Sequence, residues 1–177
     1  MLVLMRGWSG SGKSYHVQKF MKAHPGSLAY STDDFWSMDG AYRFDRERLN
    51  EAHAWNINRV RLTLKESAGL FRGKERHIFI DNVNIKVMHM QSYIDLAKQH
   101  DVQVCQFVSP SVAGTVNRWR ALCGRDDKQK ALLDVYSCWR RSTHAVPLST
   151  MVRWMEEFEI DDSIEYVLLN HQQSENL

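Results

Sequence analysis

The stretch Gly7-Trp8-Ser9-Gly10-Ser11-Gly12-Lys13-Ser14 decides the fold of this chain. It fits the phosphate-binding loop pattern Gly-x-x-x-x-Gly-Lys-Ser/Thr, with a third glycine inside it. Glycines let the backbone curl tightly, so that successive N–H groups point at one anion. In such a loop the lysine reaches the β- and γ-phosphates of a nucleotide, and the serine hydroxyl holds Mg²⁺. The predicted nucleotide-binding residues are therefore Gly7, Gly10, Ser11, Gly12, Lys13 and Ser14, with Ser14 also a metal ligand.

The residues around the loop support this interpretation. Residues 2–5 form a short apolar run, which is typical of a buried parallel strand. Residues 14–23 are predicted to be helical and end before the breaker pair Pro25-Gly26. The positive dipole end of that helix would help to bind an anion. A strand and a helix in these places favour a nucleotide site over a glycine-rich surface turn.

The composition fits one soluble globular domain spanning residues 1–177. The chain is 44% hydrophobic and 25% charged, with a net charge of +2, which argues against a nonspecific DNA coat. Cys105, Cys123 and Cys138 are widely spaced, so we expect free thiols in a reducing cytosol. No signal-peptide pattern or membrane-spanning run is present in the sequence. We therefore expect a cytoplasmic protein with no membrane partner.

Strand and helix patterns alternate along the chain, which predicts a doubly wound parallel sheet of the α/β class. Strands are predicted at 27–30, 77–80 and 102–108, with a final edge strand at 164–169. Helices are predicted at 45–66, 87–99 and 147–158, and a loop is predicted at 67–75.

Acidic side chains follow two of the predicted strands. Asp33 and Asp34 follow the strand at 27–30, and Asp81 follows the strand at 77–80. Open α/β sheets bind ligands beyond the carboxyl ends of their strands, so these carboxylates should face the phosphate loop. Either Asp33 and Asp34 orient an acceptor hydroxyl and take its proton, or they cap the next helix. Asp81 is predicted to contact the Mg²⁺ shell, as the second half of a phosphate-loop site.

His53 and Asn56 lie on the apolar stripe of the helix predicted at 45–66. Polar groups on a buried face need hydrogen-bond partners. They either brace the loop that follows the strands or line an acceptor site.

Residues 111–141 form a basic segment, with seven basic and three acidic residues and a net charge of +4. A mobile basic helical segment after the fourth strand suits a lid that closes arginines over a transferring phosphate. A solvated charged face is the alternative interpretation. The charged residues are Arg118, Arg120, Arg125, Lys128, Lys130, Arg140 and Arg141 against Asp126, Asp127 and Asp134.

Taken together, these segments resemble the P-loop polynucleotide kinase family. The likeness rests on Gly-x-x-Gly-Ser-Gly-Lys-Ser at 7–14, on Pro25-Gly26, and on the Asp33-Asp34 pair with an aromatic residue after it. It resumes in Asp-Asn-x-Asn-Ile at 81–85 and in Arg-x-Thr-x-Ala-Val-Pro at 141–147. Residues 40–45 and 51–56 are similar to related phosphate-loop ATP-binding proteins.

The resemblance implies a P-loop kinase-like fold and ATP-dependent transfer of the γ-phosphate to a hydroxyl, with Mg²⁺. It implies nucleotide roles for Lys13 and Ser14, a general-base role for Asp33, and a phosphate-neutralising role for Arg141 in the lid. The acceptor would be a nucleic acid, with DNA favoured over RNA, at a 5′-hydroxyl end or a hydroxymethyl group on a modified base. A nucleoside or other small-molecule kinase is the alternative, and a non-catalytic nucleotide-binding protein is the third interpretation.

Trp36 departs from the family pattern, because the family has a phosphate-gripping arginine at that position. An indole there suggests stacking on an acceptor base. The alternative is that Trp36 packs against the helix after it. The predicted substrate-binding residues are thus Asp34, Trp36, His53 and Asn56.

Overall fold

A computed structural model shows five parallel strands in one sheet, in the order β2-β3-β1-β4-β5. It describes residues 1–66, 76–121, 125–167 and 169, so the loop predicted at 67–75 lies outside the described residues. The sheet confirms the α/β class and the parallel pairing predicted from the sequence. Its strands are β1 (Leu2–Arg6), β2 (Leu28–Tyr30), β3 (Ile78–Ile80), β4 (Val104–Val108) and β5 (Glu165–Tyr166).

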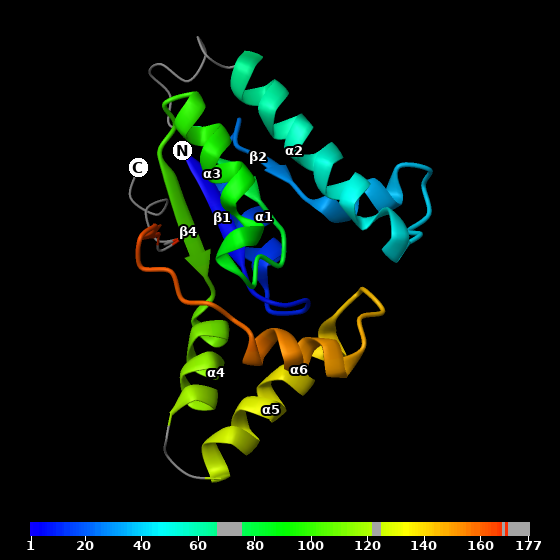
Figure 1. Cartoon of the computed structure of the whole chain (residues 1–177), viewed down its shortest axis with the longest axis vertical. Helices are drawn as coiled ribbons and strands as arrows, with labels where there is room; N and C mark the ends of the chain where they lie inside the picture. Colours follow the sequence, from blue (N-terminus) through cyan, green and yellow to red (C-terminus); the bar gives the residue numbers. More distant parts are fainter. Residues whose placement is uncertain (67–75, 122–124, 168, 170–177) are drawn as a thin grey trace.

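Helices cover both faces of the sheet (Figure 1). Alternate side chains of a strand point to opposite faces, so β1 contributes to a separate apolar core on each side. On one face Leu2 and Leu4 pack with α2 (Leu49–Glu66) and α3 (Gln91–Gln99). On the other face Val3 and Met5 pack with α1 (Lys13–Ala23). The two helices predicted at 45–66 and 87–99 each begin with a short 3₁₀ turn, η2 (Arg46–Arg48) and η4 (Val87–His89).

The predicted lid is helical and forms a layer of its own beyond the carboxyl end of β4 (Figure 1). It consists of α4 (Pro110–Arg120) and α5 (Arg125–Arg141), and both helices pack with α6 (Leu148–Glu156). An apolar core holds these three helices together, and an ion pair between Arg118 and Asp134 links α4 to α5. The core residues include Trp8, Val112, Val116, Val135, Met151, Met155 and Phe158.

Arg6, at the end of β1, ties the sheet to this helical layer. Its side chain is fully buried, and Nη1 donates to Gln106 Oε1 at 2.8 Å. Its other nitrogens donate to the carbonyls of Asn84 (3.0 Å), Ile85 (3.2 Å) and Glu159 (2.6 Å). A buried guanidinium needs such partners, since unpaired burial of a charge is costly. The start of the phosphate loop is therefore anchored to β4 and to the chain after α6.

Two further expectations bear on the fold. Cys105 and Cys138 are buried free thiols, as predicted, whereas Cys123 lies outside the described residues. None of the helices in the described part of the chain has the length and apolar character that a membrane span requires.

Candidate active site

The phosphate loop runs from the end of β1 to the start of α1, and its shape requires glycine. Gly10 has a φ of 71°, and a Cβ there would lie 2.0 Å from the carbonyl oxygen of Cys138. Gly12 is the N-cap of α1 with a φ of 91°, a left-handed conformation that glycine adopts without strain. The end of α5 thus closes directly onto the loop.

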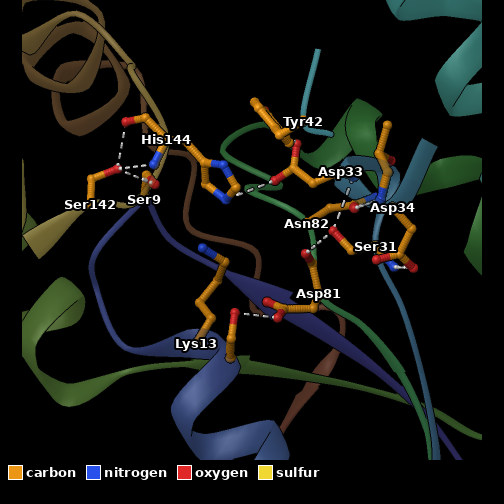
Figure 2. Close-up of polar contacts among 12 residues, drawn as sticks. Ser9, Lys13, Ser31, Asp33, Asp34, Tyr42, Asp81, Asn82, Ser142 and His144 are labelled. Atoms are coloured by element: carbon orange, nitrogen blue, oxygen red, sulfur yellow. Dashed lines mark hydrogen bonds and ion pairs between the residues drawn. The ribbon is translucent and has the colours of Figure 1, made fainter. Parts of the chain in front are cut away.

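Lys13 is buried at the mouth of the loop, with 8% of its surface exposed. Its Nζ donates to the carbonyl oxygen of Trp8 at 3.2 Å. Burial lowers the pKa of Lys13, and the nearby carboxylates of Asp81 and Asp33 oppose that shift. Figure 2 shows these three side chains pointing into one space beside the loop. Lys13 is therefore placed to contact both a phosphate and the carboxylates around it.

Ser14 and Asp81 form a pair of oxygen ligands. The Ser14 Oγ donates to Asp81 Oδ2 at 2.5 Å, and Asp81 Oδ1 is buried with no hydrogen-bond partner among the described residues. Burial raises the pKa of Asp81, while the charge of Lys13 and the Ser14 hydrogen bond lower it. Mg²⁺ prefers oxygen ligands and is commonly held by one or two carboxylates together with substrate phosphates. The unpaired carboxylate oxygen beside a hydroxyl fits that ion.

The two adjacent carboxylates, Asp33 and Asp34, have different surroundings. Both lie in η1 (Thr32–Ser37), and Asp34 completes a capping box with Ser31. Asp34 Oδ2 also pairs with Arg59 Nη1 at 2.8 Å. Asp33 instead points away from Arg59. Its carboxylate lies 3.5 Å from His144 Nε2 and 3.5 Å from the Tyr42 hydroxyl (Figure 2). Asp34 takes the capping role, so Asp33 is the carboxylate that faces the open space.

Asn82 and Asn84, the two asparagines that follow Asp81, connect neighbouring segments of the site by hydrogen bonds. Asn82 Oδ1 accepts from the backbone N–H of Thr32 at 2.8 Å, and its Nδ2 donates to Tyr93. Asn84 has a φ of 45°, and its Nδ2 donates to the carbonyl of Met5 at 2.9 Å. These two amides therefore fix η1 and the end of β1 next to Asp81.

Two predicted substrate residues are buried away from the site. Trp36 is 4% exposed and packs with Phe35 and Ala52, so the stacking prediction is wrong and the packing alternative holds. Asn56 is fully buried, and its Nδ2 donates to the Tyr93 hydroxyl at 3.0 Å, so it braces the core and does not line an acceptor site. Trp36 is covered by α2, and Asn56 lies on the buried face of α2 itself, so neither side chain is open to a ligand.

His53 and Arg141 remain near the site. His53 Nδ1 lies 3.4 Å from Thr32 Oγ1; partial burial lowers the pKa of His53, and the charge of Asp33 opposes that shift. Arg141 is exposed at the end of α5, and its Nη2 lies 3.4 Å from the Cys138 sulfur. Its predicted contact with phosphate stays a prediction.

The structure adds four residues that the sequence reasoning missed: Tyr42, Arg59, Ser142 and His144. Ser142 and His144 lie within the 141–147 stretch quoted above, at its variable positions. Tyr42 also lies in a quoted stretch, at 40–45. Arg59 carries no local signal, because only the packing of α2 brings it to Asp34.

The loop, the parallel sheet and the Lys13–Ser14–Asp81 cluster define a P-loop kinase-like domain. The chain belongs to a family described as an AAA domain, whose model matches residues 2–135.

One relative is NEDD4-binding protein 2 from Homo sapiens, 33% identical over 159 residues. The match covers 90% of this chain and 8% of that protein, so the chain spans a small part of the relative's length. Among solved structures, a gluconokinase from Sinorhizobium meliloti 1021 aligns with a TM-score of 0.50 and 13% identity. That alignment covers 93% of this chain and 79% of the gluconokinase, and it shows the shared fold.

Proposed function

We propose that this domain transfers the γ-phosphate of ATP to a hydroxyl of a nucleic acid, with DNA favoured over RNA. The acceptor would be a 5′-hydroxyl end or a hydroxymethyl group on a modified base. One observation carries the proposal: the Asp33 carboxylate faces Lys13 and Asp81 across a single space. A proton acceptor and a phosphate-binding cation are thus on opposite sides of the place where a phosphoryl group would move.

On the donor side, the loop N–H groups and the start of α1 bind the phosphates of ATP. Lys13 neutralises charge on the β- and γ-phosphates, and its burial strengthens that interaction. Ser14 and Asp81 would hold Mg²⁺, which supplies further positive charge to the phosphates. Arg141 would add a cation from the lid.

On the acceptor side, Asp33 orients the hydroxyl and takes its proton. The acceptor oxygen forms a bond to the γ-phosphorus, and the bond between that phosphorus and the oxygen bridging to ADP breaks. The proton moves to a carboxylate oxygen of Asp33, and ADP leaves with the electron pair of the broken bond. Positioning and charge neutralisation provide most of the rate enhancement in such transfers.

The resemblance to polynucleotide kinases and the basic lid both support a nucleic-acid acceptor. Among the lid cations, Arg118 is paired with Asp134, whereas Arg140 and Arg141 are exposed at the end of α5 that meets the loop. The burial of Trp36 removes the base-stacking argument, and for that reason a nucleoside or another small alcohol stays the second candidate.

The test is a screen of radiolabelled γ-phosphate transfer. Acceptors would include 5′-hydroxyl oligonucleotides of DNA and RNA, duplexes with hydroxymethyl bases, and free nucleosides, with Lys13→Ala as the matched inactive control. We expect transfer to DNA ends or modified bases. Transfer only to nucleosides would establish the alternative, and ATP binding with no transfer would indicate a regulatory nucleotide-binding protein.

A further inference from the structure

The 142–144 segment, directly after α5, spans the site from the donor loop to the acceptor carboxylate. The Ser142 hydroxyl donates to the carbonyl oxygen of His144 at 2.9 Å and lies 2.7 Å from the Ser9 Oγ in the phosphate loop. Because the single Ser142 proton goes to the carbonyl, Ser9 donates to Ser142. The His144 N–H also points to the Ser142 Oγ at 3.3 Å. One hydroxyl therefore fixes the segment against the loop.

From this anchored segment, the His144 ring reaches Asp33. His144 Nε2 lies 3.5 Å from Asp33 Oδ2, and Tyr42 donates to Asp33 Oδ1 at 3.5 Å (Figure 2). The His144 and Tyr42 rings are 5.0 Å apart. Partial burial, followed by the charge and hydrogen bond of Asp33, raises the pKa of Tyr42 to about 12, so Tyr42 stays a protonated donor. Each Asp33 oxygen thus has one donor facing it.

We propose that His144 is a positioning residue: it holds Asp33 Oδ2, so that Oδ1 is aimed at the acceptor hydroxyl. The acceptor hydroxyl would take the place of the Tyr42 hydroxyl at Oδ1. The 142–144 segment is also hydrogen-bonded to Ser9 in the phosphate loop. Docking of the lid on that loop would therefore orient the general base, Asp33, at the same time. This inference rests on the proposed function.

The physical need for such a residue follows from the exposure of Asp33. Its side chain is 47% exposed on a short 3₁₀ turn, where solvent and rotamer freedom leave a carboxylate poorly oriented. A base that is itself held by a third group is the usual arrangement around an activated nucleophile. Distances of 3.5 Å are long for hydrogen bonds, but catalytic contacts tighten when substrate binds.

The kinetic test compares His144→Ala, His144→Lys and the remote control His100→Ala, which replaces a histidine at the end of α3. We expect His144→Ala to lower kcat about ten- to hundredfold while the ATP Kd and the acceptor KM change less than about threefold. His144→Lys should recover part of the loss, because an ammonium can also donate to Asp33 Oδ2. A merely structural role would lower the thermal stability and ATP affinity of both variants alike, and that outcome overturns the proposal.

A second measurement does not depend on turnover. In NMR spectra of the ATP-bound protein with labelled histidine, Asp33→Asn should shift the His144 imidazole resonances and leave those of His100 unchanged. If the His144 resonances do not shift, His144 and Asp33 do not interact, and the inference is refuted. Wild-type protein that transfers phosphate while His144→Ala keeps full kcat refutes the inference alone. Wild-type protein that transfers no phosphate refutes the proposed function and the positioning role, while the NMR result still reports on the pair.

Discussion

Arg59 Nη1 lies 2.8 Å from Asp34 Oδ2, and this ion pair separates the roles of two adjacent carboxylates. The guanidinium is also held over the rings of Trp55 (4.3 Å) and Tyr30 (4.7 Å). α2 therefore neutralises Asp34, whereas Asp33 faces the open side of the site.

Asp33→Asn is expected to lower phosphate transfer about 10²- to 10⁴-fold while ATP still binds, because it keeps the side-chain shape and removes the proton acceptor. Steady-state kinetics and calorimetric ATP titration measure the two effects. Asp34→Asn is the matched control: an asparagine oxygen can still accept from the Ser31 N–H, so the change removes a half-exposed ion pair worth about 1 kcal/mol or less of unfolding free energy. If Asp34→Asn were the more damaging change, the assignment within the pair would be reversed.

Arg141→Ala is expected to reduce kcat at least about hundredfold and to change the ATP Kd far less. The reason is that an arginine that meets the phosphate mainly in the transition state acts on rate. Arg140→Ala, next to it on the exposed end of α5, is the control: only Arg141 is assigned to the transferring phosphate, so this variant should keep a near-normal kcat at saturating acceptor. Equal losses of affinity and rate in Arg141→Ala would indicate uniform binding of ground and transition states.

Gly10→Ala is expected to abolish tight docking of α5 on the phosphate loop. Its Cβ would lie 2.0 Å from a backbone carbonyl at Cys138, which cannot move without the helix end. ATP affinity and turnover should both fall, and differential scanning fluorimetry should show a smaller shift on adding ATP. Gly114→Ala in α4 meets only the end of the flexible Arg118 side chain, at 3.4 Å, and should raise stability by about 0.5–1 kcal/mol. Normal ATP binding by Gly10→Ala would show that α5 does not close on the loop.

Trp36→Ala is expected to destabilise the fold by about 3–5 kcal/mol, since it empties a buried aromatic position. Urea denaturation measures the change. Trp36→Phe should be milder and should leave the acceptor KM unaltered at temperatures where it is folded. A raised acceptor KM in folded Trp36→Phe would restore the stacking role that burial argues against.

The unfolding free energy is expected to fall as pH decreases from about 7.5 to 5.5. Partial desolvation lowers the pKa values of His53 and His89 below the ordinary value of 6.5, although both side chains keep exposed surface. At pH values between the lowered pKa of the native state and the ordinary pKa of the unfolded state, the unfolded chain binds more protons than the native one. The unfolding free energy therefore rises with pH, and this contribution is lost as the pH falls below about 6.5. Urea titrations of the wild type and of His89→Gln measure the slope, which should be smaller in the variant. Equal slopes would assign the pH dependence to other groups.

The sequence by itself determined the parts of this protein that depend on contiguous residues. The glycines of the loop adopt left-handed backbone conformations, and the short apolar runs of β1 and β3 are typical of buried strands. Asp81 follows its strand directly, and parallel pairing of β1 with β3 brings it beside Ser14. Local geometry and strand order are sufficient for these positions.

Only the tertiary structure decided which polar and aromatic side chains reach the site. Trp36 and His144 look equally available in the sequence, yet the packing of α2 buries the first, and the docking of α5 on Gly10 brings the second to Asp33. Burial and orientation of a side chain depend on neighbours that are distant in the chain, and no local pattern specifies them. The physical reason is that each such contact forms only when separate helices pack against the same sheet.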